Sequence, residues 1–330
     1  MHESILSTVG HTPLVRLRRV LPDCPFRLFA KLEGFNPGGS AKDRPALHML
    51  KEAMRSGTIK PSTVVIESSS GNLGIGLAQA CRYLGLRFIC VVDPKTTEQN
   101  IRILKVYGAE IDFVAHPDPE SGEFLQARIK RVKTLLETIG GSFWTNQYGN
   151  TDNARAHYRT TMEEIATELD GRIDCLFVAT GTCGTLRGCA EYVRDHNLNI
   201  RIFAVDAEGS VIFGGQPARR LVPGHGAARR PELFRADLAD ECVRTTDWDC
   251  VVGCRRLMHS EAILAGGSSG AVLMAVEKVQ ARIRPGANCV AIFHDRGERY
   301  LDTIYSDDWV AEHFGDIPCL PQSQPELEHA

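Results

Sequence analysis

The sequence predicts an α/β protein of two lobes, each a twisted and mostly parallel sheet flanked by helices. Short apolar runs such as 64–67 and 88–92 alternate with amphipathic stretches, a pattern typical of parallel strands joined by helices. The runs form two clusters, at about 60–115 and 170–295. A helical stretch at 120–165 separates the clusters, so we expect a ligand-binding cleft between two lobes.

Each element of this fold is predicted from local composition. The apolar run 64–67 is expected to be a buried strand, followed by a Ser/Gly turn and a helix at about 73–84. The strand 88–92 ends at Asp93-Pro94, and the next helix stops at Tyr107-Gly108. Four more strands are expected, at 111–114, 174–178, 200–205 and 288–293.

Composition narrows the class of protein. The 330 residues are 43% hydrophobic and carry a formal net charge of −3, and no basic run is long enough to follow nucleic-acid phosphates. The most basic stretch, 128–133, would spread its cations over several faces of a helix. There is neither a secretion signal nor an apolar run of membrane-spanning length. We therefore expect a cytoplasmic protein with no nucleic-acid or membrane partner.

The cysteines do not predict a metal site. Eleven are scattered along the chain, and the closest regular pair is Cys250 and Cys254. Zinc sites usually need two close pairs or a Cys/His set. We expect no metal and interpret the cysteines as reduced, buried thiols.

A first candidate for chemistry is the lysine in Asn36-Pro37-Gly38-Gly39-Ser40-Ala41-Lys42-Asp43-Arg44. The turn before Lys42 indicates that it opens a helix, where positive backbone N–H groups and partial burial would lower the pKa of its amine. A lowered pKa favours the free amine that a Schiff base requires. Taken alone, the residue could equally be a surface lysine at a helix start.

A second segment, Glu67-Ser68-Ser69-Ser70-Gly71-Asn72-Leu73-Gly74, lies between a strand and a helix. Hydroxyls and backbone N–H groups at a helix N-terminus suit a carboxylate, although an ordinary serine cap would need just one of these residues. The glycine spacing is not that of a dinucleotide site.

Two further segments complete the set. Gly181-Thr182-Cys183-Gly184-Thr185 also joins a strand to a helix and suits a phosphate, although a plain tight turn is the alternative. It lacks the lysine of a nucleotide-binding loop. Ala265-Gly266-Gly267-Ser268-Ser269-Gly270-Ala271 could place a serine against a pyridine nitrogen, or could simply cap a helix. A serine leaves that nitrogen largely unprotonated, which favours α,β-elimination.

These four segments, in this order, resemble the fold-type II pyridoxal-phosphate enzymes, a family with the fold of the tryptophan synthase β subunit that includes cysteine synthases and cystathionine β-synthases. The resemblance covers about residues 4–310. It implies that Lys42 is the catalytic residue and carries pyridoxal 5'-phosphate as a Schiff base. It also implies that Asn72 contacts the ring hydroxyl and Ser268 faces the ring nitrogen. The residues implied to hold the phosphate are Gly181, Thr182, Cys183, Gly184 and Thr185.

The same resemblance implies the substrate site and the lobes. The residues implied to bind the substrate carboxylate are Ser69, Ser70, Gly71, Asn72 and Leu73, with Gln147 and its neighbour Tyr148. We expect 41–149 to form a smaller, mobile lobe that carries this site. Residues 1–40 and 150–315 would form the larger, phosphate-binding lobe, and the proline- and glutamine-containing tail 316–330 is expected to be disordered.

Within the family, the chain is most similar to a siderophore-pathway branch that joins O-phospho-L-serine to L-glutamate on the route to 2,3-diaminopropionate. Cysteine synthases usually carry threonine at the position of Leu73 and phenylalanine at that of Tyr148, so both residues favour this branch. Gly181 is what cysteine synthases carry, whereas the siderophore enzymes have serine there. A cysteine synthase that uses sulfide is therefore the main alternative, and a serine or threonine dehydratase is a second one.

The expected reaction is a β-replacement through an α-aminoacrylate intermediate, with Lys42 moving the Cα proton. An anionic leaving group and a dicarboxylate acceptor call for cations in the cleft. Arg128 is the first candidate, because it matches an arginine of the siderophore enzymes, and Arg229 is the second. The alternative for each is a surface arginine. We also expect a homodimer, the commonest soluble oligomer.

Overall fold

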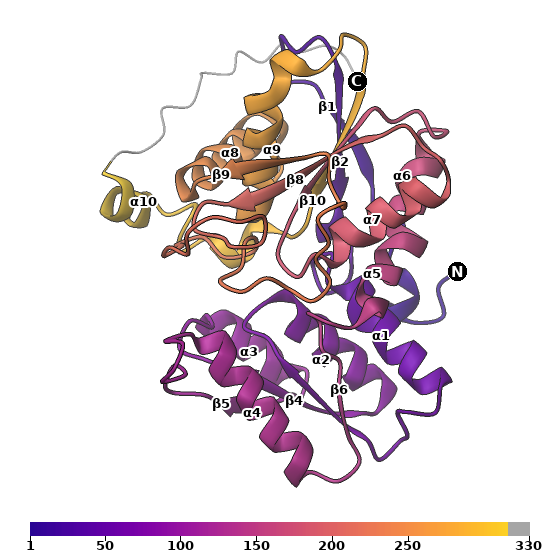
Figure 1. The fold of residues 1–330 in the computed structure, drawn as a ribbon, viewed down its shortest axis with the longest axis vertical. Helices are drawn as coiled ribbons and strands as arrows, with labels where there is room; N and C mark the ends of the chain where they lie inside the picture. The colour runs from indigo at the N-terminus through magenta and orange to yellow at the C-terminus, as the bar shows by residue number, and fades with distance from the viewer. Residues whose placement is uncertain (316–330) are drawn as a thin grey trace.

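The computed structural model describes residues 1–315, which are divided between two sheets that define an upper and a lower lobe in Figure 1. Our expectation for the tail 316–330 lies outside the described residues. Within residues 1–315, no helix combines the length and the apolar content needed to cross a bilayer.

The smaller sheet has four parallel strands in the order β5-β4-β3-β6. Its strands are β3 (Val64–Ser68), β4 (Arg87–Val92), β5 (Glu110–Phe113) and β6 (Ser142–Trp144). Successive side chains of a strand point to opposite faces. Val65 therefore packs with the helices α1 (Asp43–Arg55) and α2 (Asn72–Leu84), while Ile66 packs against α4 (Phe124–Thr138). The helix α3 (Glu98–Val106) lies between β4 and β5 in the chain.

The larger sheet has six strands in the order β1-β2-β10-β7-β8-β9, parallel except for β1 against β2. Its strands are β1 (Leu14–Leu17), β2 (Arg27–Leu32), β7 (Cys175–Ala179), β8 (Arg201–Ala207), β9 (Glu241–Thr245) and β10 (Asn288–Phe293). Phe177 faces a core with α8 (Asp247–Glu261) and α9 (Gly267–Val279), whereas Leu176 faces a core with α7 (Gly184–Asp195). Both faces of the sheet are thus covered, as parallel sheets require.

The chain passes between the lobes twice. It enters the smaller lobe through α1 and returns through α5 (Thr151–His157), and these two helices pack side by side where the lobes meet (Figure 1). A π-helical turn, η3 (Tyr158–Met162), and α6 (Glu163–Glu168) follow α5. The remaining elements are η1 (Ile5–Thr8), η2 (Glu33–Phe35), η4 (Gln280–Arg282), η5 (Gly297–Tyr300) and α10 (Asp307–Phe314).

The predicted α/β class, with two mostly parallel sheets, is confirmed, and the six strands expected from apolar runs are present. The expected helical stretch 120–165 is interrupted by β6, and β1, β2 and β9 were not predicted. The lobe boundaries at 41–149 and the mobility of the smaller lobe remain predictions.

Candidate active site

Lys42 lies directly before α1, and its surroundings favour a neutral amine. The turn before it needs glycine twice: Gly39 has φ +86°, and a Cβ on Gly38 would lie 2.5 Å from Asp43 Oδ1. Lys42 is partly buried, and this desolvation lowers the pKa of its amine, with Asp295 and Cys183 close enough to oppose the shift. The amine is therefore more readily deprotonated than that of an exposed lysine.

Asp295 follows β10. It lies within electrostatic reach of Lys42 and is hydrogen-bonded to Asn72, the residue expected to contact the cofactor ring. Asn72 Nδ2 donates to Asp295 Oδ2 at 2.8 Å, and the Tyr300 hydroxyl donates to the same oxygen at 2.7 Å. Arg299 donates to Asn72 Oδ1. The Asn72 nitrogen still has a second hydrogen that could bind a phenolate. Asp295, Arg299 and Tyr300 were missed as site residues, because no local motif indicates that they meet Asn72.

The predicted phosphate loop joins β7 to α7. Cys183 adopts φ +64° at the N-cap of α7, a left-handed conformation that is uncommon without glycine. Thr182 Oγ1 accepts from Asn153 Nδ2 at 3.2 Å, and Thr185 Oγ1 lies 3.2 Å from His157 Nε2. Burial lowers the pKa of the His157 imidazole, so it stays neutral. Both threonine hydroxyls are thus oriented by α5 beside the N–H groups that open α7.

The walls opposite this loop leave room for a ligand. A Cβ on Gly181 would have no neighbour nearer than Gly224 O at 3.9 Å, and a Cβ on Gly224 would lie 3.6 Å from the Cβ of Ser268. Ser268 is buried in the first turn of α9. The structure therefore brings Gly181 and Ser268 to the same loop, 222–226, as a shared cofactor site requires.

Gly184 is expected to be intolerant of any side chain. A Cβ there would lie 2.1 Å from Asn153 Oδ1, and Asn153 Nδ2 holds both Thr182 Oγ1 and Gln147 O. Gly184→Ala should cost about 1–3 kcal/mol of unfolding free energy through overpacking and should weaken cofactor binding. Urea unfolding and a cofactor titration measure both effects. Gly140→Ala is the matched control, because its Cβ would meet nothing within 4 Å, and equal losses in the two variants would contradict the explanation.

The β3–α2 loop contributes backbone groups more than side chains. Ser69 Oγ accepts from Gly74 N at 2.9 Å, so this hydroxyl caps the N-terminus of α2. Leu73 is 2% exposed and packs in the core of the smaller lobe. A Cβ on Gly71 would meet nothing within 4 Å, so the loop is open on that side. Ser70 is partly buried. An anion here would be bound mainly by the N–H groups that open α2.

Glu67 at the end of β3 organises the loop that carries Gln147. Its carboxylate accepts from Thr145 Oγ1 at 2.6 Å, Trp144 Nε1 at 3.1 Å and Gln147 N at 3.1 Å. Gln147 Nε2 in turn donates to Ser68 O at 3.0 Å. Burial raises the pKa of the Glu67 carboxyl despite these donors. Two loops distant in sequence are thereby held together at one end of the smaller sheet.

The two predicted arginines lie in different surroundings. Arg128 is 7% exposed, and its Nε lies 3.0 Å from Asp93 Oδ2. Its Nη1 is buried without a hydrogen-bond partner among residues 1–315. Arg229 is exposed and donates to Gln126 Oε1 at 3.3 Å, across the two lobes. The roles of both in substrate binding remain predictions.

Arg220 is a cation that the sequence analysis missed. It is partly buried, and desolvation lowers the pKa of its guanidinium. It lies within electrostatic reach of Tyr148 and Glu123, and its polar contact is Nη1 to His225 O at 3.5 Å. Two guanidinium groups, those of Arg128 and Arg220, therefore lie within electrostatic reach of Tyr148, together with the Glu67 carboxyl.

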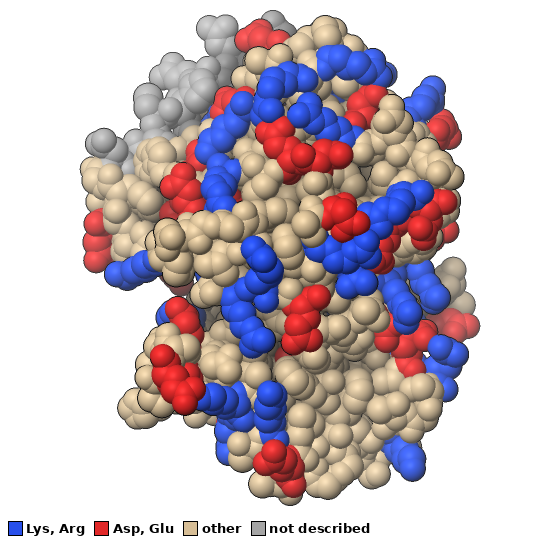
Figure 2. All heavy atoms as spheres, viewed as in Figure 1, with Lys and Arg blue, Asp and Glu red and all other residues tan. Residues whose placement is uncertain are grey.

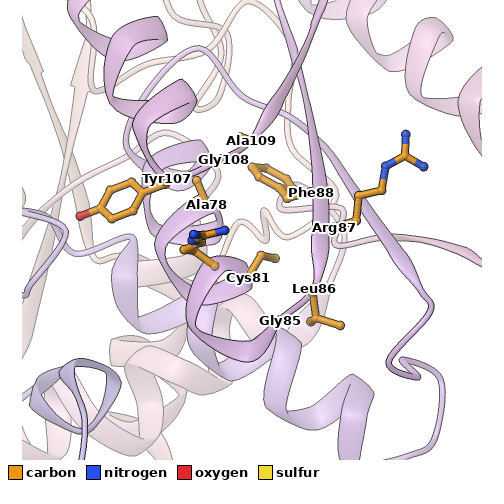
Figure 3. Close-up of a pocket in the computed structure, with 10 residues that line it drawn as sticks. Ala78, Cys81, Gly85, Leu86, Arg87, Phe88, Tyr107, Gly108 and Ala109 are labelled. Atoms are coloured by element: carbon orange, nitrogen blue, oxygen red, sulfur yellow. The ribbon is translucent and has the colours of Figure 1, made fainter.

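One hollow of the molecule lies apart from the predicted site. It has a volume of about 240 Å³ and lies in the smaller lobe, where the end of α2 meets the start of β4 and the end of α3 (Figure 3). Its wall includes Cys81, Phe88 and Tyr107 but none of the predicted site residues. The candidate site is therefore identified by its chemical groups and not by the volume of a cavity.

Comparisons with known proteins agree with this geometry. The sequence profile of the pyridoxal-phosphate dependent enzyme family matches residues 5–295, and the chain belongs to that family. It is 46% identical over 309 residues, 94% of the chain and 91% of the relative, to the N-(2-amino-2-carboxyethyl)-L-glutamate synthase of Ralstonia nicotianae.

Two solved structures have the same fold. The O-acetylserine dependent cystathionine β-synthase of Helicobacter pylori is 31% identical, with a TM-score of 0.86 over 93% of this chain and 99% of that one. A hydrogen sulfide-producing enzyme of Fusobacterium nucleatum is 32% identical, with a TM-score of 0.85 over 91% and 98% of the two chains. The predicted fold-type II class is confirmed.

Pyridoxal phosphate is the cofactor of this family, and the described residues fit it. A partly buried amine with a lowered pKa, the open N-terminus of α7 and the room around Gly181 match its aldehyde, phosphate and ring. Lys42 would hold the aldehyde carbon, 181–185 the phosphate, and Ser268 and Asn72 the ring. These individual roles remain predictions.

Proposed function

We propose that this enzyme joins O-phospho-L-serine to L-glutamate, forming N-(2-amino-2-carboxyethyl)-L-glutamate and phosphate. The observation that carries the proposal is the 46% identity to the Ralstonia nicotianae synthase over 94% of the chain. The two arginines within electrostatic reach of Tyr148, Arg128 and Arg220, support it, because donor and acceptor are both anions. The product would feed 2,3-diaminopropionate and siderophore biosynthesis.

The residues of the chain would have the following roles in this reaction. Pyridoxal phosphate, when bound, supplies the electron sink that makes the Cα proton of the donor acidic. Lys42 Nζ would take that proton and later return it, which its lowered pKa favours. The open side of the β3–α2 loop and Gln147 would orient the donor carboxylate. Phosphate would leave Cβ of the donor and take up the proton that the acceptor ammonium gives up, and the freed amine would bond to that carbon.

Gly181 favours a second candidate, a cysteine synthase that uses sulfide, since cysteine synthases carry glycine there. A dehydratase, with water as the sole acceptor, is the third. Incubating the holoenzyme with O-phospho-L-serine and then L-glutamate or sulfide, with mass analysis of the products, separates them. We expect the glutamate adduct; cysteine with no adduct, or pyruvate alone, would overturn the proposal.

Gln147→Ala is expected to increase the loss of donor to pyruvate by on the order of a few-fold per turnover. Gln147 Nε2 holds its loop to Ser68 O, and we propose that loss of this bond loosens the predicted closure over the donor and admits water to the reactive carbon. Coupled assay of pyruvate against adduct measures the partition. A variant with slower turnover but an unchanged partition would show that Gln147 binds the donor without excluding water.

Arg128→Gln is expected to raise KM for O-phospho-L-serine about tenfold or more, since a charge-assisted hydrogen bond would be lost. Its partnerless Nη1 supports this role. Because the same change breaks the pair with Asp93, Asp93→Asn is the control for purely structural damage. If both variants raise KM equally, Arg128 acts through that pair and not on the substrate.

We also propose a cytoplasmic homodimer. Ten cysteines among residues 1–315 are free thiols, which suits a reducing compartment. Dimers are the commonest soluble oligomers, and sedimentation of the purified holoenzyme tests the expected state.

A further inference from the structure

A second cavity, of about 150 Å³, lies beside the candidate active site and is built from both lobes. The smaller lobe contributes one face of α4, with Leu125, Ile129 and Lys133, together with Trp144, Asn146 and Tyr148. The loop between β8 and β9 contributes 229–232. A cavity of this volume has room for a small organic molecule and not only for a few waters.

Charged groups of this cavity have hydrogen bonds but no ion pairs among residues 1–315. Arg229 donates to Gln126, and Arg230 donates to Ile212 O at 3.0 Å and lies over the Phe234 ring. The cavity wall carries the cations Lys133, Arg229 and Arg230 and the anion Glu232, and none of them has an ion-pair partner within 4 Å among residues 1–315. Basic neighbours behave differently, since Arg235 in the same loop pairs with Asp237 at 2.7 Å. Figure 2 shows basic side chains gathered where the two lobes meet. A net positive cavity with one carboxylate suits a ligand with more negative than positive groups.

Hydrogen bonds connect the cavity to the predicted donor site. Glu67 accepts from Trp144 Nε1 in the cavity wall and from Gln147 N in the donor loop. Tyr148, the next residue, lines the cavity and accepts at its backbone oxygen from Leu233 N at 3.0 Å. A ligand in the cavity would therefore lie against the loop that carries Gln147, the residue predicted to bind the donor.

Glu232 and Asn146 add a carboxylate and an amide that can bind polar groups of a ligand. A Cβ on Gly149 would lie 2.4 Å from Glu232 Oε2 and 2.7 Å from Asn146 Nδ2, so the carboxylate and the amide converge over that glycine. Arg229 reaches across the cavity to Gln126 on α4. Glu232, Arg229 and Arg230 in the loop of the larger lobe, facing Lys133 on α4 of the smaller lobe, complement a molecule with two carboxylates and one ammonium group.

We propose that this cavity is the docking site of the acceptor, an α-amino dicarboxylic acid, with its carboxylates on Arg229 and Lys133 and its ammonium on Glu232. The inference rests on the proposed function and adds the place where the acceptor is recognised. It gives a role to Arg229, which is exposed, distinct from that predicted for Arg128, which is buried.

The test compares two acceptors on the holoenzyme. Arg229→Gln and Lys133→Gln should each raise KM for L-glutamate about tenfold and should lower the ratio of kcat/KM for L-glutamate over L-glutamine. KM for O-phospho-L-serine should change less than twofold. Arg229→Lys should recover part of the loss, and Arg235→Gln, outside the cavity, is the matched control. An unchanged acceptor ratio in both cavity variants would overturn the inference while leaving the proposed function intact.

A second measurement isolates Glu232. Glutarate, which has both carboxylates but no amine, should inhibit competitively against L-glutamate. Glu232→Gln should weaken L-glutamate about tenfold and leave inhibition by glutarate as strong or stronger. Equal weakening of both ligands would refute the assignment of the ammonium. A wild-type enzyme that makes no adduct with L-glutamate would overturn the proposed function and the docking site with it.

Discussion

Lys42→Ala is expected to reduce the β-replacement rate by at least about 10³-fold, with the fold intact. The amine of Lys42 is the group that would hold the cofactor and move the Cα proton, and burial keeps it free of a proton more often than an exposed lysine. Lys31 cannot replace it. Lys31, which is fully buried, is bound by Glu168 at 2.7 Å and Glu164 at 3.1 Å.

Three measurements check this expectation. Wild-type protein with added pyridoxal phosphate should absorb as a covalently linked cofactor, and borohydride should fix the label on the peptide that contains Lys42. Lys42→Ala should still bind the cofactor through 181–185, but without the covalent label. Lys51→Ala, on the exposed side of the same helix, is the control. Label on another lysine, or a variant with more than a tenth of the activity, would contradict the assignment.

The sequence predicts those parts of the site that lie on a single loop between a strand and the start of a helix. Lys42 and 181–185 are recognisable because glycine, hydroxyl and lysine occur within a few residues of each other, where strand gives way to helix. Asp295 and Arg220 could not be found in this way. They reach the site through long-range packing, at the end of β10 and in the loop after β8, and no local pattern encodes that approach.

The missed strands have a related cause. β6 is three residues long, and β2 contains Lys31, whose charge does not suggest a buried strand. Lys31 can be buried because Glu164 and Glu168 come from α6, more than a hundred residues away. A buried charge is tolerated only with such partners. The strand can therefore be predicted only when the partners of Lys31 are known.

Arg44→Met is expected to lower the free energy of unfolding by about 3–5 kcal/mol, because it would leave the fully buried Glu33 carboxylate without its ion-pair partner. Arg44 is 2% exposed, and its guanidinium donates to Glu33 at 2.6 and 2.7 Å and to Glu164 at 2.6 and 2.8 Å. It lies two residues after Lys42, so the network also fixes the helix start that positions the amine. Cofactor affinity should fall together with stability.

The sign of the pH dependence separates this network from general loss of packing. Burial, the largest single influence, would raise the pKa of the Glu33 carboxyl, but Arg44, with smaller contributions from Thr12 and Lys31, lowers it below the usual 4.5. The stabilisation is therefore complete above that value and is lost as pH falls through the lower pKa of the folded state. Urea unfolding from pH 8 to 3 should show the gap between wild type and Arg44→Met narrowing as pH falls, because burial without Arg44 raises the Glu33 pKa in the variant, whereas the pKa is lowered in wild type. A gap independent of pH would indicate that Arg44 stabilises by packing, and the exposed Arg55→Met should leave stability unchanged throughout.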